Sequence, residues 1–177
     1  MPNMSWESVL NAPLPGAGAA YNTSTTLTDV SPAPQLTLPA NYLQVGSAIQ
    51  VDAQFSASNT ATPTLLVGVY FGGVAGIALA ATTAITTTTA MASWPWRVRY
   101  KGVVRTTGTA GSIMGGGEVW VPTSLTAGAW RPIPEIALAT VAIDTTVAKA
   151  ITLGAQWGTS SASNTLTCQT FIVESKA

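Results

Sequence analysis

The amino-acid sequence predicts an all-β fold, because two stretches alternate with the period of a strand and turn-prone segments separate them. In residues 151–157, Ile151, Leu153 and Trp157 alternate with Thr, Gly and Gln, and in residues 94–101 large apolar residues alternate with Arg and Lys. Side chains that repeat every second residue share one face of a strand, so each stretch predicts a strand with one buried face. Segments rich in Thr, Ser and Gly connect such stretches, as is typical of turns.

The composition fits one domain with a sizeable core and a terminal extension. Of the 177 residues 47% are hydrophobic and only 8% are charged, and seven basic residues balance seven acidic ones. Proteins that bind nucleic acid concentrate Lys and Arg on one face, so a nucleic-acid partner is not predicted. The low charge favours assembly, because contacts between subunits bury uncharged surface that would otherwise promote precipitation.

Residues 1–33 predict an extended N-terminal arm, and residues 34–177 predict the β-sandwich domain. No basic segment and no apolar segment follows Met1, so a secretory signal is not supported. Pro and Gly interrupt any periodic pattern in the arm. Two interpretations remain open: a free terminus, or an arm that docks on a neighbouring subunit through Trp6 and Tyr21.

The next strands are predicted in residues 48–55 and 64–71. The first stretch alternates cleanly between apolar and polar residues, whereas the second is apolar at both parities and predicts a central strand buried on both faces. Residues 65–81 carry no charge and approach the roughly 20 residues of a membrane span. Four glycines within this stretch and the absence of a basic flank favour β-structure instead, so no membrane partner is predicted.

The strand predicted in residues 93–105 has a basic face. Arg97, Arg99 and Lys101 lie on one side, opposite Trp and other large apolar residues. One interpretation is a row of solvated charges that keeps the strand soluble and discourages edge pairing. The other is a site for phosphate or an acidic partner surface.

The segment from residue 111 to 122 predicts a strand that contains the triplet Gly115, Gly116 and Gly117. A phosphate-binding loop would need a following Lys and Ser or Thr at the start of a helix, but a strand pattern follows instead. A bulge or a close backbone approach is therefore predicted. Val119, Trp120 and Val121 are expected to be core and interface residues. The prolines in residues 123–138 predict an edge or a loop crossing, and residues 139–144 predict a further strand.

The final hairpin is predicted in residues 151–175. Its return strand changes phase, since Leu166 and Cys168 share one face whereas Phe171 and Val173 share the other. Either a β-bulge intervenes, or both faces are covered. Coverage of both faces would indicate a subunit contact.

The residues needed for common catalytic and metal sites are missing or unpaired. The chain has no His and a single Cys, which excludes Ser-His-Asp and Cys-His arrangements and the usual zinc sites. Cys168 lies in an apolar strand and is expected to be an inert buried thiol. Nothing in the sequence pairs Asp52, Glu118, Glu135 or Asp144 across a cleft. No enzyme, cofactor or metal site is predicted.

Six segments between residues 36 and 174 carry a family resemblance. They are residues 38–43 (LPANYL), 45–51 (VGSAIQV), 62–73 (TPTLLVGVYFGG), 108–117 (GTAGSIMGGG), 141–157 (VAIDTTVAKAITLGAQW) and 161–167 (SASNTLT). In this order they resemble small structural proteins of tailed bacteriophages, which include head decoration, or cement, proteins. The resemblance leaves the N-terminal arm unmatched.

The resemblance implies a jelly-roll β-sandwich of the viral or tumour-necrosis-factor type. Such folds pack two four-stranded sheets face to face, and three copies assemble about an axis. With further strands predicted in residues 36–45 and 74–80, the sequence predicts about eight to ten strands, which suit that architecture independently. The family supplies no catalytic residue.

The expected function is therefore that of a capsid decoration protein on the outer surface of the virion, made in the host cytoplasm. Its expected partners are itself, as a homotrimer, and the major capsid protein. The residues expected to contact the capsid are Trp6, Tyr21, Arg97, Arg99 and Lys101, and those expected at the subunit interface are Leu65, Val67, Phe171 and Val173. The alternative is a receptor-binding or glycan-binding tail or head-fibre protein, which would use aromatic residues such as Trp130 or Trp157 in distal loops.

Overall fold

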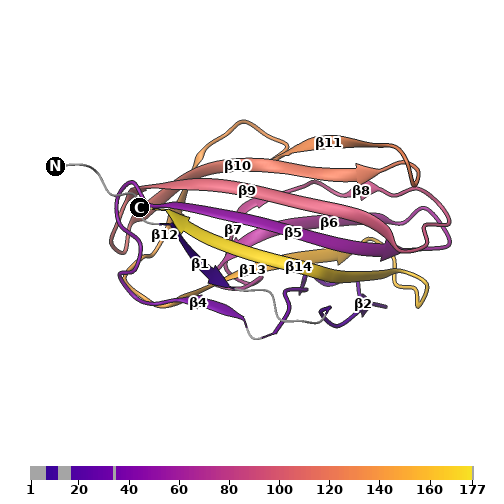
Figure 1. The fold of residues 1–177 in the computed structure, drawn as a ribbon, viewed down its shortest axis with the longest axis horizontal. Helices are drawn as coiled ribbons and strands as arrows, with labels where there is room; N and C mark the ends of the chain where they lie inside the picture. Colours follow the sequence, from indigo (N-terminus) through magenta and orange to yellow (C-terminus); the bar gives the residue numbers. More distant parts are fainter. Residues whose placement is uncertain (1–6, 12–16, 34, 177) are drawn as a thin grey trace.

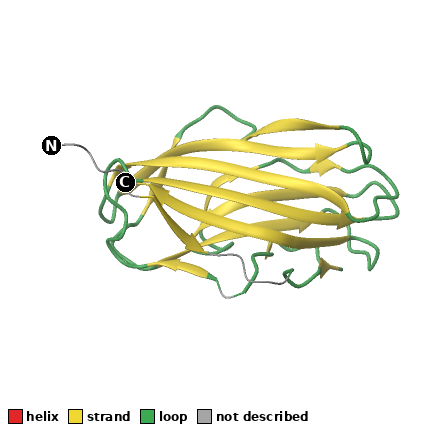
Figure 2. Ribbon diagram, viewed as in Figure 1, coloured by secondary structure: helices red, strands yellow, loops and turns green. Residues whose placement is uncertain are grey.

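The computed structural model describes residues 7–11, 17–33 and 35–176, and it folds them into two antiparallel β-sheets packed face to face (Figure 1). Every regular element that these residues form is a strand (Figure 2). The predicted all-β sandwich is therefore confirmed.

The larger sheet has eight strands and the smaller sheet has six. In spatial order the larger sheet contains β1 (Glu7–Asn11), β14 (Thr165–Lys176), β5 (Ala48–Ser58), β9 (Trp94–Thr106), β10 (Gly111–Pro122) and β11 (Gly128–Ile133), with β12 (Thr140–Ile143) beside β10 and β2 (Tyr21–Asn22) beside β14. The smaller sheet contains β3 (Thr28–Asp29), β13 (Lys149–Trp157), β6 (Thr64–Phe71) and β7 (Ile77–Ala81), with β4 (Leu36–Leu38) beside β13 and β8 (Ile85–Thr86) beside β6. Short edge strands therefore extend both sheets beyond the four strands that the resemblance implied.

The long strands of the larger sheet form where the sequence alternates. In β5 the side chains of Ile49, Val51 and Phe55 point into the core, and the polar residues between them point outward. In β9 the side chains of Trp96 and Tyr100 are buried in the same way. Burial of one apolar face against the other sheet is what stabilises these strands.

Strand β6 is buried on both faces over residues 67–71, as its sequence predicts, whereas Thr64 and Leu66 are partly exposed. It pairs with β13 on one side and with β7 and β8 on the other. Tyr70 on its outer face lies over Gly154, and Leu27 lies beside the same glycine. Part of the cover on this face thus comes from Leu27, just before β3 of the same chain. None of the described residues forms a helix of the length and apolarity needed to cross a membrane.

A β-bulge explains the phase change in the final hairpin. The register of β14 against β5 shifts between Cys168 and Thr170, so Gln169 is the extra residue. Because one residue is inserted, side chains before and after the bulge point to the same side of the sheet. The bulge interpretation is confirmed, and the apolar side chains before and after the bulge are buried in the same core.

The four residues expected at a subunit interface are core residues of the single chain. Leu65, Val67, Phe171 and Val173 are each 0% exposed. Their side chains pack between the two sheets, with those of Phe171 and Val173 turned inward by the bulge. A side chain with no exposed area in one chain has no surface to offer to another. The prediction of subunit packing through these residues is therefore corrected.

The described part of residues 1–33 lies against the sandwich. β1 and β2 pair with β14, and β3 pairs with β13. Tyr21 is only 7% exposed, and its hydroxyl donates to the carbonyl oxygens of Ser24 and Thr26, both at 2.9 Å. Tyr21 therefore packs against the sandwich of its own chain, where it pairs with Leu166. Its docking on a neighbouring subunit stays a prediction. Trp6 lies outside the described residues.

The predicted close backbone approach is found in the glycine triplet of β10. A Cβ added at Gly115 would lie 2.5 Å from the carbonyl oxygen of Lys101, and one added at Gly117 would lie 2.8 Å from the Cα of Tyr100. Real Cβ atoms do not approach backbone atoms this closely. The triplet thus lets β10 pack tightly against β9.

Candidate functional site

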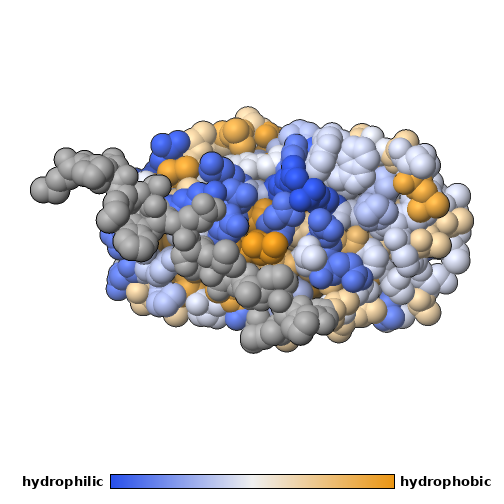
Figure 3. All heavy atoms as spheres, viewed as in Figure 1, coloured by the Kyte–Doolittle hydropathy of each residue, from blue (hydrophilic) through white to orange (hydrophobic). Residues whose placement is uncertain are grey.

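The outer face of the larger sheet brings together polar, charged and aromatic side chains from five strands. Strongly hydrophilic residues gather across the middle of this face, over β5, β9 and β10 (Figure 3). The strand register sets Asp52 opposite Arg99, and Arg99 opposite Glu118. The next outward-facing row along the strands consists of Thr170, Gln54, Arg97, Trp120 and Trp130.

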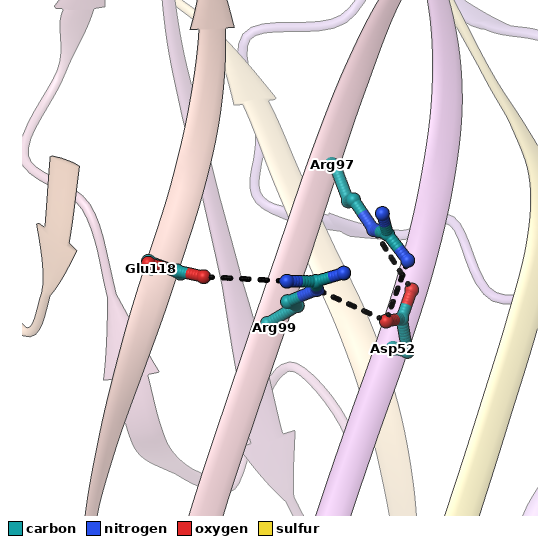
Figure 4. A network of polar contacts seen from close by, with 4 residues as sticks. All are labelled: Asp52, Arg97, Arg99 and Glu118. Carbon is teal, nitrogen blue, oxygen red and sulfur yellow. Dashed lines mark hydrogen bonds and ion pairs between the residues drawn. The ribbon is translucent and has the colours of Figure 1, made fainter. Parts of the chain in front are cut away.

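Asp52 is the centre of an ion-pair network (Figure 4). Both of its oxygens accept hydrogen bonds from Arg97, at 3.0 Å from Nη2 and 3.2 Å from Nε. Arg99 donates from Nε to Asp52 at 3.2 Å, and its Nη1 lies 3.6 Å from Oε1 of Glu118. These side chains are partly exposed, so the network orients the arginines more than it stabilises the fold.

The basic row expected on β9 is therefore largely neutralised. Arg97 and Arg99 are paired with Asp52 and Glu118, whereas Lys101 is exposed and makes no ion pair with the described side chains. The four paired groups carry no net charge. The row presents one unpaired cation to a partner instead of three.

Two tryptophans stand beside this network at the edge of the sheet. The rings of Trp120 and Trp130 lie 5.3 Å apart between centroids and are tilted by 60°. The guanidinium carbon of Arg99 lies 5.6 Å from the centroid of the Trp130 ring, within the range of a cation–π contact. Trp120 also lies over Gly128 of β11, where an added Cβ would be 2.6 Å from its ring. Both rings are thus held in fixed orientations.

Trp120 and its neighbours in β10 face opposite sides of the sheet. Val119 and Val121 are core residues, as expected, whereas Trp120 points to the outer face. The alternation of Trp120 with two valines was the signal in the sequence that could have placed it there. Trp130 is 44% exposed and lies on β11, whereas Trp157 is 0% exposed and lies in the core. Of the two aromatics suggested for ligand binding, only Trp130 is accessible, and it lies on a strand and not in a distal loop.

A groove of about 540 Å³ runs between the tryptophan pair and β14. Its lining includes Gln54, Ser56, Arg97, Trp120, Trp130 and Gln169, and the buried Phe55 and Trp96 lie at its base together with Ser93 and Pro95. Gln169 reaches it because the bulge turns this residue outward, and its Nε2 donates to Oγ of Ser56 at 2.8 Å. The bulge that preserves the core therefore also supplies a polar group to the groove.

Comparison of the sequence with protein-family models and with curated proteins finds no match.

The acidic and thiol groups outside the groove are engaged elsewhere or buried. Asp144 accepts hydrogen bonds from the backbone and the hydroxyl of Thr146, which lowers the pKa of its carboxyl. Burial raises the pKa of the Cys168 thiol to about 12, so this thiol is protonated at neutral pH, in agreement with the buried residue expected there. Within the described part of the chain, no three His, Cys, Asp or Glu residues gather as a metal site would require.

Glu135 ties the segment after β11 to the loop after β7. Its carboxylate accepts hydrogen bonds from the backbone nitrogen of Thr83, at 2.8 Å, from the Thr83 hydroxyl, and from Arg131 at 3.2 Å. Burial acts to raise the pKa of this carboxyl. The hydrogen bonds from Thr83 and Arg131 and the charge of Arg131 outweigh burial and lower the pKa below its usual 4.5.

We expect Glu135 to make the stability of the protein depend on acid pH. A carboxyl whose pKa is lowered by folding stabilises the protein above its unfolded pKa, and this contribution is lost as the pH falls through the folded pKa. Glu135→Gln should lower the free energy of unfolding by about 1 kcal/mol at neutral pH. In urea titrations the difference from wild type should shrink as the pH falls below 4.5, the usual pKa of this carboxyl. Glu118→Gln, which breaks a longer ion pair, is the control. A difference for Glu135→Gln that does not diminish as the pH falls would contradict the expectation.

Proposed function

We propose that this chain is a non-catalytic structural protein of a bacteriophage particle, a decoration protein that binds the outer surface of the assembled head. We propose further that it has jelly-roll topology and acts as a homotrimer. The sequence segments that resemble phage structural proteins support this proposal. So does a surface with few charges, on which Arg97 and Arg99 are neutralised by neighbouring carboxylates.

The single observation that carries the proposal is the composition of one end of the sandwich. Loops 39–47, 72–76, 107–110 and 144–148 meet there, and Asp144 is the only charged residue in them. The large apolar side chains exposed at this end are Tyr42, Val45, Ile77 and Val147. Exposed apolar side chains gathered at one end of a molecule are typical of a surface that contacts another protein.

Hydrogen bonds between these loops make the end rigid. The backbone nitrogen of Asn41 donates to the carbonyl of Thr145 at 2.8 Å, and that of Gly108 donates to the Thr145 hydroxyl at 2.8 Å. The nitrogen of Gly72 donates to the carbonyl of Ala150 at 2.7 Å. A surface that is ordered before binding loses less conformational entropy when it docks.

Stabilisation of the head would follow from mass action. A protein that binds the assembled shell and not its separated subunits stabilises the shell in proportion to its binding free energy. This mechanism needs no catalytic residue, and it needs as many copies as there are sites on the shell. The copy number per virion, measured against the major capsid protein, should therefore approach one to one.

We expect Val45→Asp combined with Val147→Asp to weaken binding to assembled heads at least about tenfold. A charge at either position would have to lose its hydration when the loop end docks. Leu125→Asp is the control, because Leu125 is at least as exposed as Val45 and Val147 but lies in the loop at the opposite end of β10. Co-sedimentation of each variant with heads that lack the protein measures the effect.

Two results would contradict the decoration proposal. One is a virion with only a handful of copies of this chain, which would favour a tail or fibre component. The other is an equal loss of head binding in the Leu125→Asp control. The trimer is tested separately, by light scattering in solution, where the mass should be three times the 18.1 kDa of one chain.

A further inference from the structure

The groove beside Trp120 and Trp130 has no role in the docking proposed above. β5 begins at Ala48, beside the apolar loop end, and reaches Gln54 and Ser56 of the groove only near its other end. The groove therefore stays open to solvent when the loop end is occupied. We propose that it is a binding site for an uncharged saccharide chain.

The dimensions of the groove suit a small ligand. Its volume of about 540 Å³ lies within the roughly 300–1,000 Å³ that is typical of ligand sites. Such sites combine aromatic surface with a few polar groups that fix the orientation of the ligand. Here the aromatic surface comes from Trp120 and Trp130, and the polar groups come from Gln54, Ser56 and Gln169.

The aromatic side chains are placed for stacking against a sugar ring. The face of an indole ring carries partial negative charge, so it attracts the weakly positive C–H groups on the apolar face of a pyranose. Arg99 contacts Trp130, and the ring of Trp120 rests over Gly128, so both orientations are set before a ligand arrives. Pre-set side chains lose little entropy on binding.

The polar side chains can satisfy hydroxyl groups. The amides of Gln54 and Gln169 each offer donors and an acceptor, and the hydroxyl of Ser56 offers both. Such groups match sugar hydroxyls, which also donate and accept. The groove therefore offers hydrogen-bonding groups beside its aromatic surface, as a saccharide requires.

The charge balance selects a ligand without charge. The guanidinium group of Arg97, at the wall of the groove, is held by both oxygens of Asp52. Arg99 is shared between Asp52 and Glu118. A charged ligand would have to compete with these internal partners, whereas a neutral saccharide can bind without disrupting them.

The proposal is tested by isothermal titration of the full chain with defined neutral hexasaccharides of glucose, mannose, galactose and N-acetylglucosamine, and with an acidic oligogalacturonide. We expect at least one neutral probe to bind with a dissociation constant between about 10 μM and 1 mM. Trp130→Ala should weaken that binding at least about tenfold, and Gln169→Ala should weaken it severalfold. Val45→Ala, at the opposite end of the sandwich, should leave it unchanged. Near-ultraviolet circular dichroism of each variant shows that the fold is retained.

Three outcomes would overturn the proposal. The first is that no neutral probe binds at concentrations up to about 5 mM. The second is that only the acidic probe binds. The third is that Trp130→Ala changes the oligomeric mass or head binding, since the groove would then be a protein interface. Neither the absence of neutral binding nor binding of the acidic probe alone bears on the decoration proposal, because that proposal is tested with variants at the loop end.

Discussion

Replacing Gly117 with alanine is expected to lower the free energy of unfolding by about 3 kcal/mol or more, and to leave little folded protein in cells. The added Cβ would meet the carbonyl oxygen of Arg99 and lie 2.8 Å from the Cα of Tyr100. Both contacts are with the backbone of β9, which cannot rotate away as a side chain can. The pairing of the two strands would have to shift to make room.

Urea unfolding of purified protein, or the soluble yield where the variant does not fold, measures this effect. Gly115→Ala should behave in the same way, because its Cβ would lie 2.5 Å from the carbonyl oxygen of Lys101. Gly18→Ala is the matched control, since its Cβ would approach nothing closer than 3.4 Å and its effect should stay within about 1 kcal/mol. A Gly117→Ala variant as stable as Gly18→Ala would show that β9 and β10 are not packed as tightly as described.

The second large effect is expected at Trp157. Its side chain is fully buried in the core, and truncation to alanine should cost about 3–5 kcal/mol through lost burial and the cavity left behind. Trp157→Phe should cost less, because the indole nitrogen finds no hydrogen-bond partner among the described residues and its removal leaves no donor unsatisfied. Urea unfolding followed by far-ultraviolet circular dichroism measures both variants.

Trp130→Ala is the matched control for Trp157→Ala. Both changes remove the same side chain, but Trp130 is 44% exposed on an edge strand, so its loss should cost about 1 kcal/mol or less. Similar destabilisation by the two variants would contradict the assignment of Trp157 to the core and Trp130 to the surface.

The strands of the sandwich could be predicted where one face of a strand is buried and the other is solvated. The alternation in residues 48–55 and 94–101 appears in the structure as β5 and β9, with their apolar residues inward. The central position of residues 64–71 and the buried Cys168 were also predictable, because continuous apolar sequence has to be covered. These features depend on neighbours along the chain, which the sequence displays directly.

The candidate site was less predictable, because its parts come from five strands that are distant in sequence. The sequence places Arg97 and Arg99 on one face of a strand, but it does not show that Asp52, about 45 residues earlier, lies between them. It offers Trp130 and Trp157 as equivalent aromatics, although one is on the surface and the other is in the core. Only strand pairing decides which charges are neutralised and which rings are accessible.

The sequence by itself determines that this chain is an all-β protein with few charges, without histidine and with alternating strands that must bury one face. The tertiary structure decides that residues 17–33 cover their own sandwich and that the bulge at Gln169 turns Phe171 into the core. It also decides that Asp52 holds two arginines beside a tryptophan groove. The reason is physical: periodicity fixes which face of a strand is apolar, whereas register and long-range pairing fix what that face, and the opposite one, will meet.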